Sequence, residues 1–342
     1  MGKPTVHDIA KSAGVSLATV DRVLNARPGV RQKTIDRVNA AVDTLGYVRN
    51  LSAANLARQR EYRMAFVLPE GPSQFVETLR DALREMQANG MSERLGLKQF
   101  KIPPRDPHVA VKILQQIGAA GFDGVAIMAP ETPEIRDAVY RLKEAGIAVV
   151  ALVSDLPSSQ RDRFVGIDNI AAGRTAGLLM GRFQRGVSGK LLIVAGLMTA
   201  HEAIERRLGF DEVIAERFPE LTVLPTLEGH DDPERIQQVL ARAFKLNPDV
   251  SGVYSIGSGN LPLLQALAPF RRDFSPVIIG HELTPTMRQA LLDDQIDAVI
   301  TQNVGHLVRS AIRVLKAKCD DAKILESQEQ IRIDIVVREN LQ

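Results

Sequence analysis

The segment from Thr5 to Asn25, TVHDIAKSAGVSLATVDRVLN, restricts the possible folds of this chain more than any other stretch. Thr5 is placed to cap the start of a helix, Gly14 allows the left-handed turn that ends it, and Ser16 is placed to cap a second helix. Between Thr5 and Gly14, four apolar side chains have the i, i+3, i+4, i+7 spacing of one helical face: Val6, Ile9, Ala10 and Ala13. The segment therefore predicts two short amphipathic helices joined by a tight turn.

The second of these helices has two distinct faces. Its apolar face consists of Val20, Val23 and Leu24, and its opposite face consists of Leu17, Ala18, Asp21, Arg22 and Asn25. On the opposite face, small side chains permit close approach to the major groove of DNA, where Arg22 can form two hydrogen bonds with a guanine. A third helix follows, with an apolar stripe of Ile35, Val38, Val42 and Leu45. The three helices predict a helix-turn-helix domain.

Positive charge is concentrated in the same part of the chain. The whole sequence carries 43 Lys and Arg against 41 Asp and Glu, a net charge of +2. Residues 1–60 contain ten Lys and Arg against four Asp and Glu, a net charge of +6, which leaves −4 for the remainder. A basic domain attracts the phosphate backbone, so the charge favours DNA binding over the alternative of a helical hairpin inside another type of domain.

Two stretches carry a resemblance to a known family, namely VSLATVDRVLN and the later KTIDRVNAAVDTLGY. On these residues the chain resembles the LacI/GalR family of bacterial transcription regulators. The resemblance implies an α/β protein with a three-helix headpiece over residues 1–49, a hinge helix or linker over residues 50–61, and a body over residues 62–342. That body would have two lobes with two parallel sheets, like a periplasmic binding protein. Arg31 and Arg49 depart from the family pattern, which usually has a capping serine and a proline at these places.

The side chains of the headpiece have different predicted roles toward DNA. Arg22 is the candidate for reading a base, and Leu17 and Ala18 restrict which neighbouring bases fit. Phosphate contacts are expected from hydroxyl and amide donors, which are Thr5, Ser16, Thr19, Asn25 and Thr34. Asp21 stands where the family commonly has serine, and its carboxylate either repels phosphates or accepts a hydrogen bond from a cytosine amino group.

Residues 50–60, NLSAANLARQR, have the composition of an alanine-rich helix that is too short to be stable alone. The resemblance implies that this hinge helix pairs with that of a second subunit in the minor groove, where Leu56 would insert between base steps and kink the duplex. In the alternative interpretation the segment is a solvated tether and Leu56 packs on the body.

From Met64 onward, apolar runs alternate with helical patterns, which predicts βαβ units with parallel strands. We expect two lobes with the break between them at residues 186–189, and a last strand over residues 331–337 that returns to one lobe. Ligands of such sheets bind at the carboxyl ends of the strands, here in the cleft between the lobes. The other expected strands are residues 64–68, 96–100, 124–128, 148–152, 190–194, 221–227, 252–256, 277–280 and 298–301, with helices such as 77–88, 108–120, 171–185, 204–217 and 233–246 between them.

Polar residues of the predicted second lobe are candidates for ligand contacts in this cleft. By resemblance, Arg206 occupies the place of a ligand-gripping arginine, Glu282 that of an aspartate that accepts sugar hydroxyls, and Gln302 that of an amide that reads a hydroxyl. Asn260 would have the same part on its own turn. His281 and the longer side chain of Glu282 depart from the family pattern.

The predicted first lobe contributes further candidates. Phe75 follows the first strand, where its ring would lie against a sugar ring, and Ser154 and Asp155 follow the fourth strand. Asp168, in the sequence VGIDNIAAG, resembles the acidic residue of an Asp-Asn pair in the family, and helix capping is its alternative role. Only 4% of the residues are aromatic and none is tryptophan, which favours a small, hydroxyl-rich ligand held by hydrogen bonds.

The sequence gives little support for catalysis, a cofactor or a metal site. The six histidines are scattered without metal-ligand spacing, and the turn at residues 257–260 lacks the lysine of a phosphate-binding loop. The single Cys319 excludes an internal disulfide. Since the chain shows neither a signal-peptide pattern nor a run of roughly 20 apolar residues, we expect a cytoplasmic protein without membrane association.

These features predict a sequence-specific regulator of the LacI type, most simply a repressor, that binds double-stranded operator DNA as a homodimer. A small sugar, sugar acid or polyol in the cleft would control it. By analogy with the family, the dimer face is expected in residues 74–85 and 285–292. The alternatives are a cytoplasmic sugar-binding protein, which the basic headpiece disfavours, or a sugar-acting enzyme without a role at DNA, which would require turnover by the body.

Overall fold

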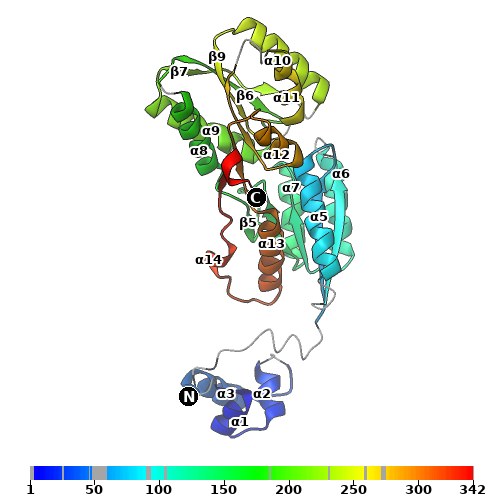
Figure 1. The fold of residues 1–342 in the computed structure, drawn as a ribbon. Helices are drawn as coiled ribbons and strands as arrows, with labels where there is room; N and C mark the ends of the chain where they lie inside the picture. Colours follow the sequence, from blue (N-terminus) through cyan, green and yellow to red (C-terminus); the bar gives the residue numbers. More distant parts are fainter. Residues whose placement is uncertain are drawn as a thin grey trace. The chain divides into compact units, whose positions relative to one another are not determined.

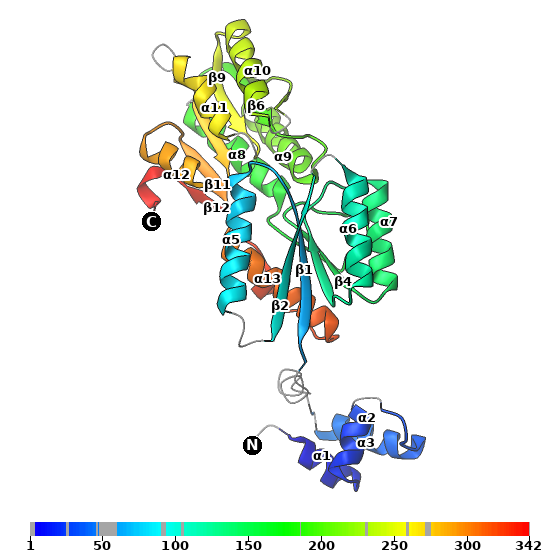
Figure 2. The ribbon, with the colours of Figure 1, turned by 90° about the vertical axis from the view of Figure 1, so that its right-hand side faces the viewer.

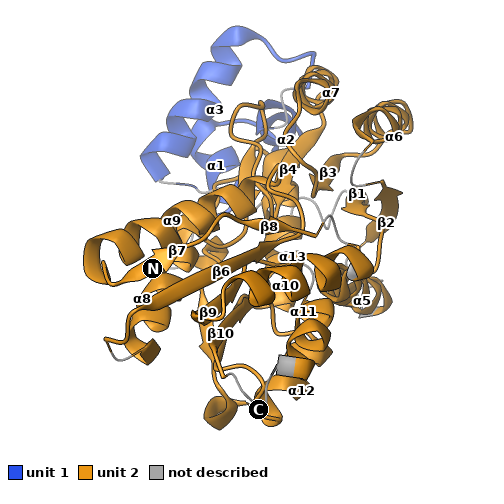
Figure 3. Ribbon diagram, turned by 90° about the horizontal axis from the view of Figure 1, so that it is seen from above, with its two compact units in different colours: residues 1–60 blue, residues 61–342 orange. Residues whose placement is uncertain are grey.

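The computed structural model describes residues 4–24, 27–45, 47, 60–89, 94–103, 106–184, 186–229, 232–257, 260–270 and 275–341. The chain divides into two compact units, residues 1–60 and residues 61–342, which are blue and orange in Figure 3. We call the first unit the headpiece and the second the body. Among the helices of the described residues, none has the length and apolar character needed to cross a membrane.

The headpiece consists of three helices, α1 (Val6–Ala13), α2 (Leu17–Leu24) and α3 (Gln32–Leu45). Thr5 and Asp8 cap the start of α1 reciprocally, because each side chain accepts a hydrogen bond from the other residue's backbone N–H, and Gly14 ends the helix at φ +61°. Val6 is the one member of the predicted first stripe that stays exposed. The buried core of the headpiece consists of Ile9, Ala10, Ala13, Val20, Val38 and Ala41.

The first lobe of the body is a parallel sheet of five strands in the order β2-β1-β3-β4-β5. Alternate side chains of β1 enter different cores, since Phe66 packs with α5 and Val67 packs with α6 and α7. Figure 2 shows α5 on one side of this sheet and α6 and α7 on the other. The elements are β1 (Tyr62–Pro69), α5 (Gln74–Asn89), β2 (Leu95–Ile102), α6 (Pro107–Ala119), β3 (Gly124–Ile127), α7 (Pro133–Glu144), β4 (Ala148–Leu152) and β5 (Arg163–Val165).

The second lobe is a sheet in the order β12-β11-β10-β9-β6-β7, with β8 beside β6. Every pair is parallel except β11 and β12. Helices α10, α11 and α12 share one core with this sheet, and α8 and α9 share the other (Figure 1). The elements are α8 (Asn169–Gln184), β6 (Gly189–Ala195), α9 (His201–Arg217), β7 (Leu221–Val223), β8 (Leu227–Glu228), α10 (Pro233–Leu246), β9 (Val250–Ser255), α11 (Asn260–Leu267), η2 (Ala268–Phe270), β10 (Val277–His281), α12 (Pro285–Leu292), β11 (Ala298–Thr301), β12 (Asp334–Val336) and η3 (Arg338–Asn340).

The described part of the body crosses between the lobes at residues 166–168, 302–303 and 330–333. After β11 the chain returns to the first lobe as α13 (Val304–Cys319) and α14 (Glu326–Glu329), and α13 packs against α5, β3 and β4. The third crossing then leads to β12, which pairs with β11 in the antiparallel sense. Each lobe is therefore built from separate stretches of the sequence.

The predicted break between the lobes at residues 186–189 is wrong. The glycines there join α8 to β6 within the second lobe, and Gly186 has the φ of +78° that a turn requires. The first crossing comes earlier, after β5. That strand has three residues, which is too short to show a periodic pattern in the sequence.

Helices α8 and α9 touch backbone to backbone through two glycines. A Cβ added at Gly173 would lie 2.0 Å from the backbone oxygen of Arg206, and one added at Gly209 would lie 2.1 Å from the backbone oxygen of Ile170. Real Cβ atoms do not approach that closely, so these two positions require glycine. Because the backbone of Arg206 takes part in this contact, the contact fixes the position of Arg206 on α9 relative to α8.

Candidate functional site

Helix α2 presents the face that the sequence predicted for DNA. Leu17, Ala18, Asp21 and Arg22 are exposed on it, while Val20 is fully buried. Leu17 is 42% exposed although it is apolar, which leaves it available for contact with a partner. The Asp21 carboxylate lies 3.2 Å from the Arg27 guanidinium, so part of its negative charge is already balanced within the headpiece.

The predicted phosphate donors of the headpiece also hold its helix ends. The Ser16 hydroxyl accepts from the backbone N–H of Thr19 at 3.2 Å and lies 2.9 Å from the Thr19 hydroxyl. Thr5 caps α1 in the same way, and Thr34 lies half-buried in the first turn of α3. Asn25 and Leu56, and with Leu56 the predicted hinge helix, lie outside the described residues.

The body contains a cavity of about 560 Å³ lined by residues of both lobes. We call it the cleft cavity. Its walls follow the carboxyl ends of β1, β3 and β4 in the first lobe and of β6, β9 and β10 in the second. Of the residues predicted from the sequence, Phe75, Ser154, Arg206, Asn260 and Glu282 line it.

Arg206 lies at the inner wall of the cleft cavity and is only 3% exposed. Its guanidinium donates to the Asn169 side-chain oxygen at 2.9 Å, to the Ile256 backbone oxygen at 2.8 Å and to Glu282 Oε1 at 3.4 Å. Gln302 Nε2 donates to the same oxygen of Glu282 at 3.0 Å. The structure thus brings Arg206, Glu282 and Gln302 together, with Gln302 behind Glu282 at the second crossing.

Glu282 is held in an unfavourable state in two respects. Burial raises the pKa of its carboxyl, and the Arg206 charge and the hydrogen bond from Gln302 only partly oppose this. Its backbone has φ +67°, a left-handed conformation that is uncommon for a residue with a Cβ. Val153, on the opposite wall of the cleft cavity, has φ +66°, which is rarer still for a β-branched residue. Such strain is typical of ligand sites.

Several buried polar atoms around the cleft cavity have no hydrogen-bond partner among the residues that the structure describes. They are Ser154 Oγ, Glu202 Oε2, Glu282 Oε2 and Gln302 Oε1, and each can accept a hydrogen bond. Sequence reasoning missed Glu202, although its position one helical turn before Arg206 on α9 places it on the same face. Asn260 is already committed, since it accepts from the Ser255 hydroxyl and donates to the His281 backbone oxygen.

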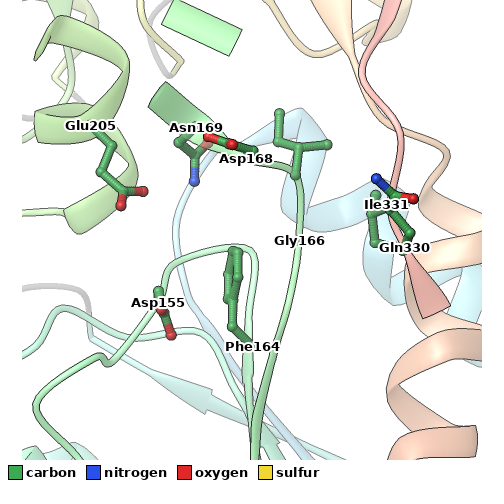
Figure 4. A pocket seen from close by; sticks show the side chains of 9 residues that line it. Asp155, Phe164, Gly166, Asp168, Asn169, Glu205, Gln330 and Ile331 are labelled. Atoms are coloured by element: carbon green, nitrogen blue, oxygen red, sulfur yellow. The ribbon is translucent and has the colours of Figure 1, made fainter. Parts of the chain in front are cut away.

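Asp155 and Asp168, also predicted for the ligand, line a different cavity of about 370 Å³ (Figure 4). We call it the crossing cavity, because residues of the first and third crossings form part of its wall. Asp155 forms a bidentate pair with Arg161, and Asp168 accepts from the backbone N–H of Ala171 at 2.9 Å. Asp168 therefore has the capping role that the sequence left open.

His281 packs directly beneath the cleft cavity and is fully buried. Its Nε2 lies 2.7 Å from the Tyr254 hydroxyl, and the Tyr254 ring stacks on Phe210. Burial lowers the pKa of His281 well below its usual value, and the nearby Arg206 charge lowers it further. The imidazole is consequently neutral in the folded protein at physiological pH.

This neutral histidine predicts a loss of stability in mild acid. In the unfolded chain His281 binds a proton below about pH 6.5, whereas its depressed pKa keeps it neutral in the folded chain. Proton binding therefore stabilises the unfolded chain, and the free energy of unfolding decreases as the pH falls below that value. We expect the free energy of unfolding of wild type to fall by up to about 1.4 kcal/mol per pH unit more steeply than that of His281→Asn. Urea titrations from pH 7.5 to pH 5 measure this, with His108→Asn at an exposed site as control. Parallel profiles for wild type and His281→Asn would contradict it.

Within the described residues, no group of histidine, cysteine, aspartate and glutamate side chains is arranged to hold a metal ion. The Cys319 thiol donates to the Asp123 backbone oxygen at 3.4 Å. The chemistry that the cleft cavity offers is recognition of hydrogen-bond donors by buried oxygen atoms.

Comparison with known proteins agrees with both units. Residues 5–50 match the family described as bacterial regulatory proteins, lacI family, and residues 64–323 match the periplasmic binding protein domain. The HTH-type transcriptional regulator DegA of Bacillus subtilis is 27% identical over 176 residues, which cover 51% of this chain and 50% of DegA. RegA of Clostridium saccharobutylicum is 28% identical over 76% of this chain and 77% of its own length.

The chain thus spans only about half the length of the first curated relatives it matches. Among solved structures, the glucose-galactose binding protein GanP from Geobacillus stearothermophilus has a TM-score of 0.74 at 19% identity, covering 82% of this chain and 99% of GanP. That likeness concerns the fold of the body. With its helix-turn-helix headpiece and its two-lobed periplasmic-binding-protein body, the chain belongs to the lacI family of bacterial regulatory proteins.

Proposed function

We propose that this protein is a repressor that binds operator DNA as a homodimer and is controlled by a neutral sugar or polyol in the cleft cavity. The observation that carries the proposal is a set of buried acceptor atoms on residues that line that cavity, Ser154 Oγ, Glu202 Oε2 and Glu282 Oε2, which have no partner among the described residues, in a chain that also exposes a recognition face on α2. Ligand hydroxyls would satisfy these acceptors, which are costly to leave unpaired.

The charges of the cleft cavity favour a neutral ligand over a sugar acid or a phosphate. Among the described residues that line it, Arg206 is the only cation, and its guanidinium already donates to three protein acceptors. Three carboxylates line the same cavity, those of Glu70, Glu202 and Glu282. An anionic ligand would meet net negative charge, and the one guanidinium that could bind it already donates three of its five N–H groups to the protein.

A thermal-shift panel on the whole chain tests the ligand class. We expect neutral sugars or polyols to raise the melting temperature of the body, because a ligand at about 100 times its Kd adds about 2.7 kcal/mol of stability. Ser154→Ala and Glu282→Gln should reduce the shift, since each removes an acceptor or weakens it. Shifts produced only by sugar acids or sugar phosphates would contradict the assignment to neutral ligands.

Homodimer formation is supported by the continuity of the predicted dimer face. The backbone N–H of Thr286, on α12, lies 3.4 Å from the side-chain oxygen of Gln74, on α5, so residues 74–85 and 285–292 are adjacent in the body. Two headpieces related by a two-fold axis would read the two halves of a palindromic operator.

Base reading by Arg22 predicts a specific effect of its replacement. Arg22→Ala should weaken operator binding by about 1–3 kcal/mol and relax the preference for one base, because a bidentate arginine–guanine contact contributes that much discrimination. Gel-shift titrations at fixed salt, on the operator and on single-base variants of it, measure this. Arg37→Ala on α3 removes the same charge without a base contact and should weaken all sequences alike. Equal behaviour of the two variants would remove Arg22 from base readout.

A further inference from the structure

We propose that the crossing cavity is a second ligand site, separate from the cleft cavity, that takes a small amine bearing hydroxyl groups. Figure 4 shows the residues around it, and none of them also lines the cleft cavity. The wall comes from Gly166, Ile167 and Asp168 of the first crossing, Gln330 and Ile331 of the third, and the flanking side chains of Asp155, Phe164, Asn169 and Glu205. The proposal does not depend on what the cleft cavity binds.

The side chain of Asn169 points an unpaired donor into this cavity. Asn169 is 1% exposed, and its amide orientation is fixed by Arg206, because a guanidinium only donates and the atom that faces it must be the amide oxygen. The amide nitrogen is therefore turned away from Arg206 and toward the cavity, as Figure 4 shows. Among the described residues this nitrogen makes no hydrogen bond, and the nearest acceptor group that influences it is the Glu205 carboxylate of the same wall. A buried N–H without a partner is costly, so the position calls for an acceptor on a ligand.

The charge of the cavity is negative and only partly balanced. Among the described residues that line it are three carboxylates, Asp155, Asp168 and Glu205, and no lysine or arginine. Arg161 neutralises Asp155, but Asp168 only caps α8, and Glu205 contacts His201 at 3.2 Å. Burial raises the pKa of Glu205, and the nearby His201 and, to a smaller extent, the Asn169 amide only partly oppose this. A positive group placed between Asp168 and Glu205 would offset this cost.

An aromatic ring forms another part of the wall. A Cβ added at Gly166 would lie 2.4 Å from the ring of Phe164, so glycine at this crossing lets the ring lie against the backbone. Phe164 is partly exposed and borders the same cavity as Asp155 and Glu205 (Figure 4). An ammonium group is attracted to such a ring as well as to carboxylates.

Together, these features indicate the class of ligand that fits the crossing cavity. The ammonium would interact with Asp168, Glu205 and the ring of Phe164, and a neighbouring hydroxyl would accept from the amide of Asn169. A simple alkylammonium ion has no acceptor and would leave the Asn169 N–H unpaired. An anion would be repelled by the carboxylates. An amino sugar or amino alcohol provides both groups in a volume that about 370 Å³ admits.

Isothermal titration of the full chain with glucosamine tests the proposal, with glucose as the uncharged counterpart. We expect glucosamine to bind wild type and to bind Glu205→Gln at least about tenfold more weakly, because hydrogen bonds to charged groups are the strong ones. Glu202→Gln changes the same residue type one turn earlier on α9, where the side chain lines the cleft cavity, and Glu212→Gln changes an exposed position of the same helix. Neither of these should weaken glucosamine binding by more than about twofold.

A second variant covers the case in which Glu205→Gln does not fold, as judged by circular dichroism. Phe164→Leu keeps an apolar side chain but removes the ring. It should also weaken glucosamine binding, while the titration with glucose should give the same result as with wild type. If Glu202→Gln rather than Glu205→Gln abolishes the binding, the amine occupies the cleft cavity and the proposal is wrong. It is equally wrong if neither glucosamine nor ethanolamine gives a saturable signal with wild type at tens of millimolar.

Discussion

Arg206→Ala should lower the free energy of unfolding of the body by about 3–5 kcal/mol, because removing one partner of a buried ion pair leaves the other charge uncompensated. Glu282 is 6% exposed and would keep only the hydrogen bond from Gln302. The Ile256 carbonyl and the Asn169 amide oxygen would also lose their donor. Urea denaturation followed by far-ultraviolet circular dichroism measures the change.

Arg207→Ala provides a control at the next residue. Arg207 pairs with Asp211 near the surface and donates to Thr226, so its loss should cost about 1 kcal/mol or less. The Arg206→Ala penalty should also shrink as the pH falls, since the pKa of Glu282 is already raised and the carboxyl becomes neutral more readily without its cation. The double variant Arg206→Ala with Glu282→Gln should recover part of the lost stability. Equal losses for Arg206→Ala and Arg207→Ala would contradict the buried ion-pair account.

Gly209→Ala should destabilise the body by about 3 kcal/mol, at the upper end of the cost of overpacking. The added methyl group would lie 2.1 Å from the Ile170 oxygen and 2.9 Å from the Arg174 nitrogen, and backbone atoms cannot move aside as a flexible side chain can. Helices α8 and α9 would have to separate, which would shift Arg206 relative to Asn169. We therefore expect weaker ligand binding in the cleft cavity together with a lower melting temperature.

Gly118→Ala is the matched control, because Gly118 is also helical, in α6. An added Cβ there would make an ordinary contact at 3.6 Å with Leu142. Since alanine favours a helix over glycine, this variant should be stabilised by about 0.4–1 kcal/mol. A destabilised Gly118→Ala together with an unaffected Gly209→Ala would show that the helix contact does not require glycine.

The elements that the sequence predicted are those with long, regular apolar patterns. The strands at residues 64–68 and 148–152 and the helix at residues 233–246 occur as β1, β4 and α10, because burial on one or both faces imposes a visible period. The predicted strand at residues 221–227 is instead two short strands, β7 and β8, that both pair with β6. The bounds of such short strands are set by their pairing with neighbouring strands more than by the apolar pattern of their own residues.

The grouping of the site residues was predictable only in part. Resemblance placed Arg206, Glu282 and Gln302 in one site, and the structure brings them into contact; their role as ligand contacts stays a prediction. The same reasoning assigned Asp155 and Asp168 to that site, whereas the structure places them on the crossing cavity. The side of a crossing that a residue faces is set by the packing of segments distant in the sequence, such as Gln330 beside the first crossing. The local sequence pattern does not contain this information.

The three crossings have a consequence for synthesis of the chain. The sheet of the first lobe is complete at residue 165, but α13, which covers one of its faces together with α5, ends only at Cys319. During translation this lobe leaves the part of that apolar face that α13 will cover exposed while most of the second lobe, up to β11, is being made. No single cut in the body releases one finished lobe, so fragments ending between residues 165 and 304 should associate with chaperones or aggregate rather than fold.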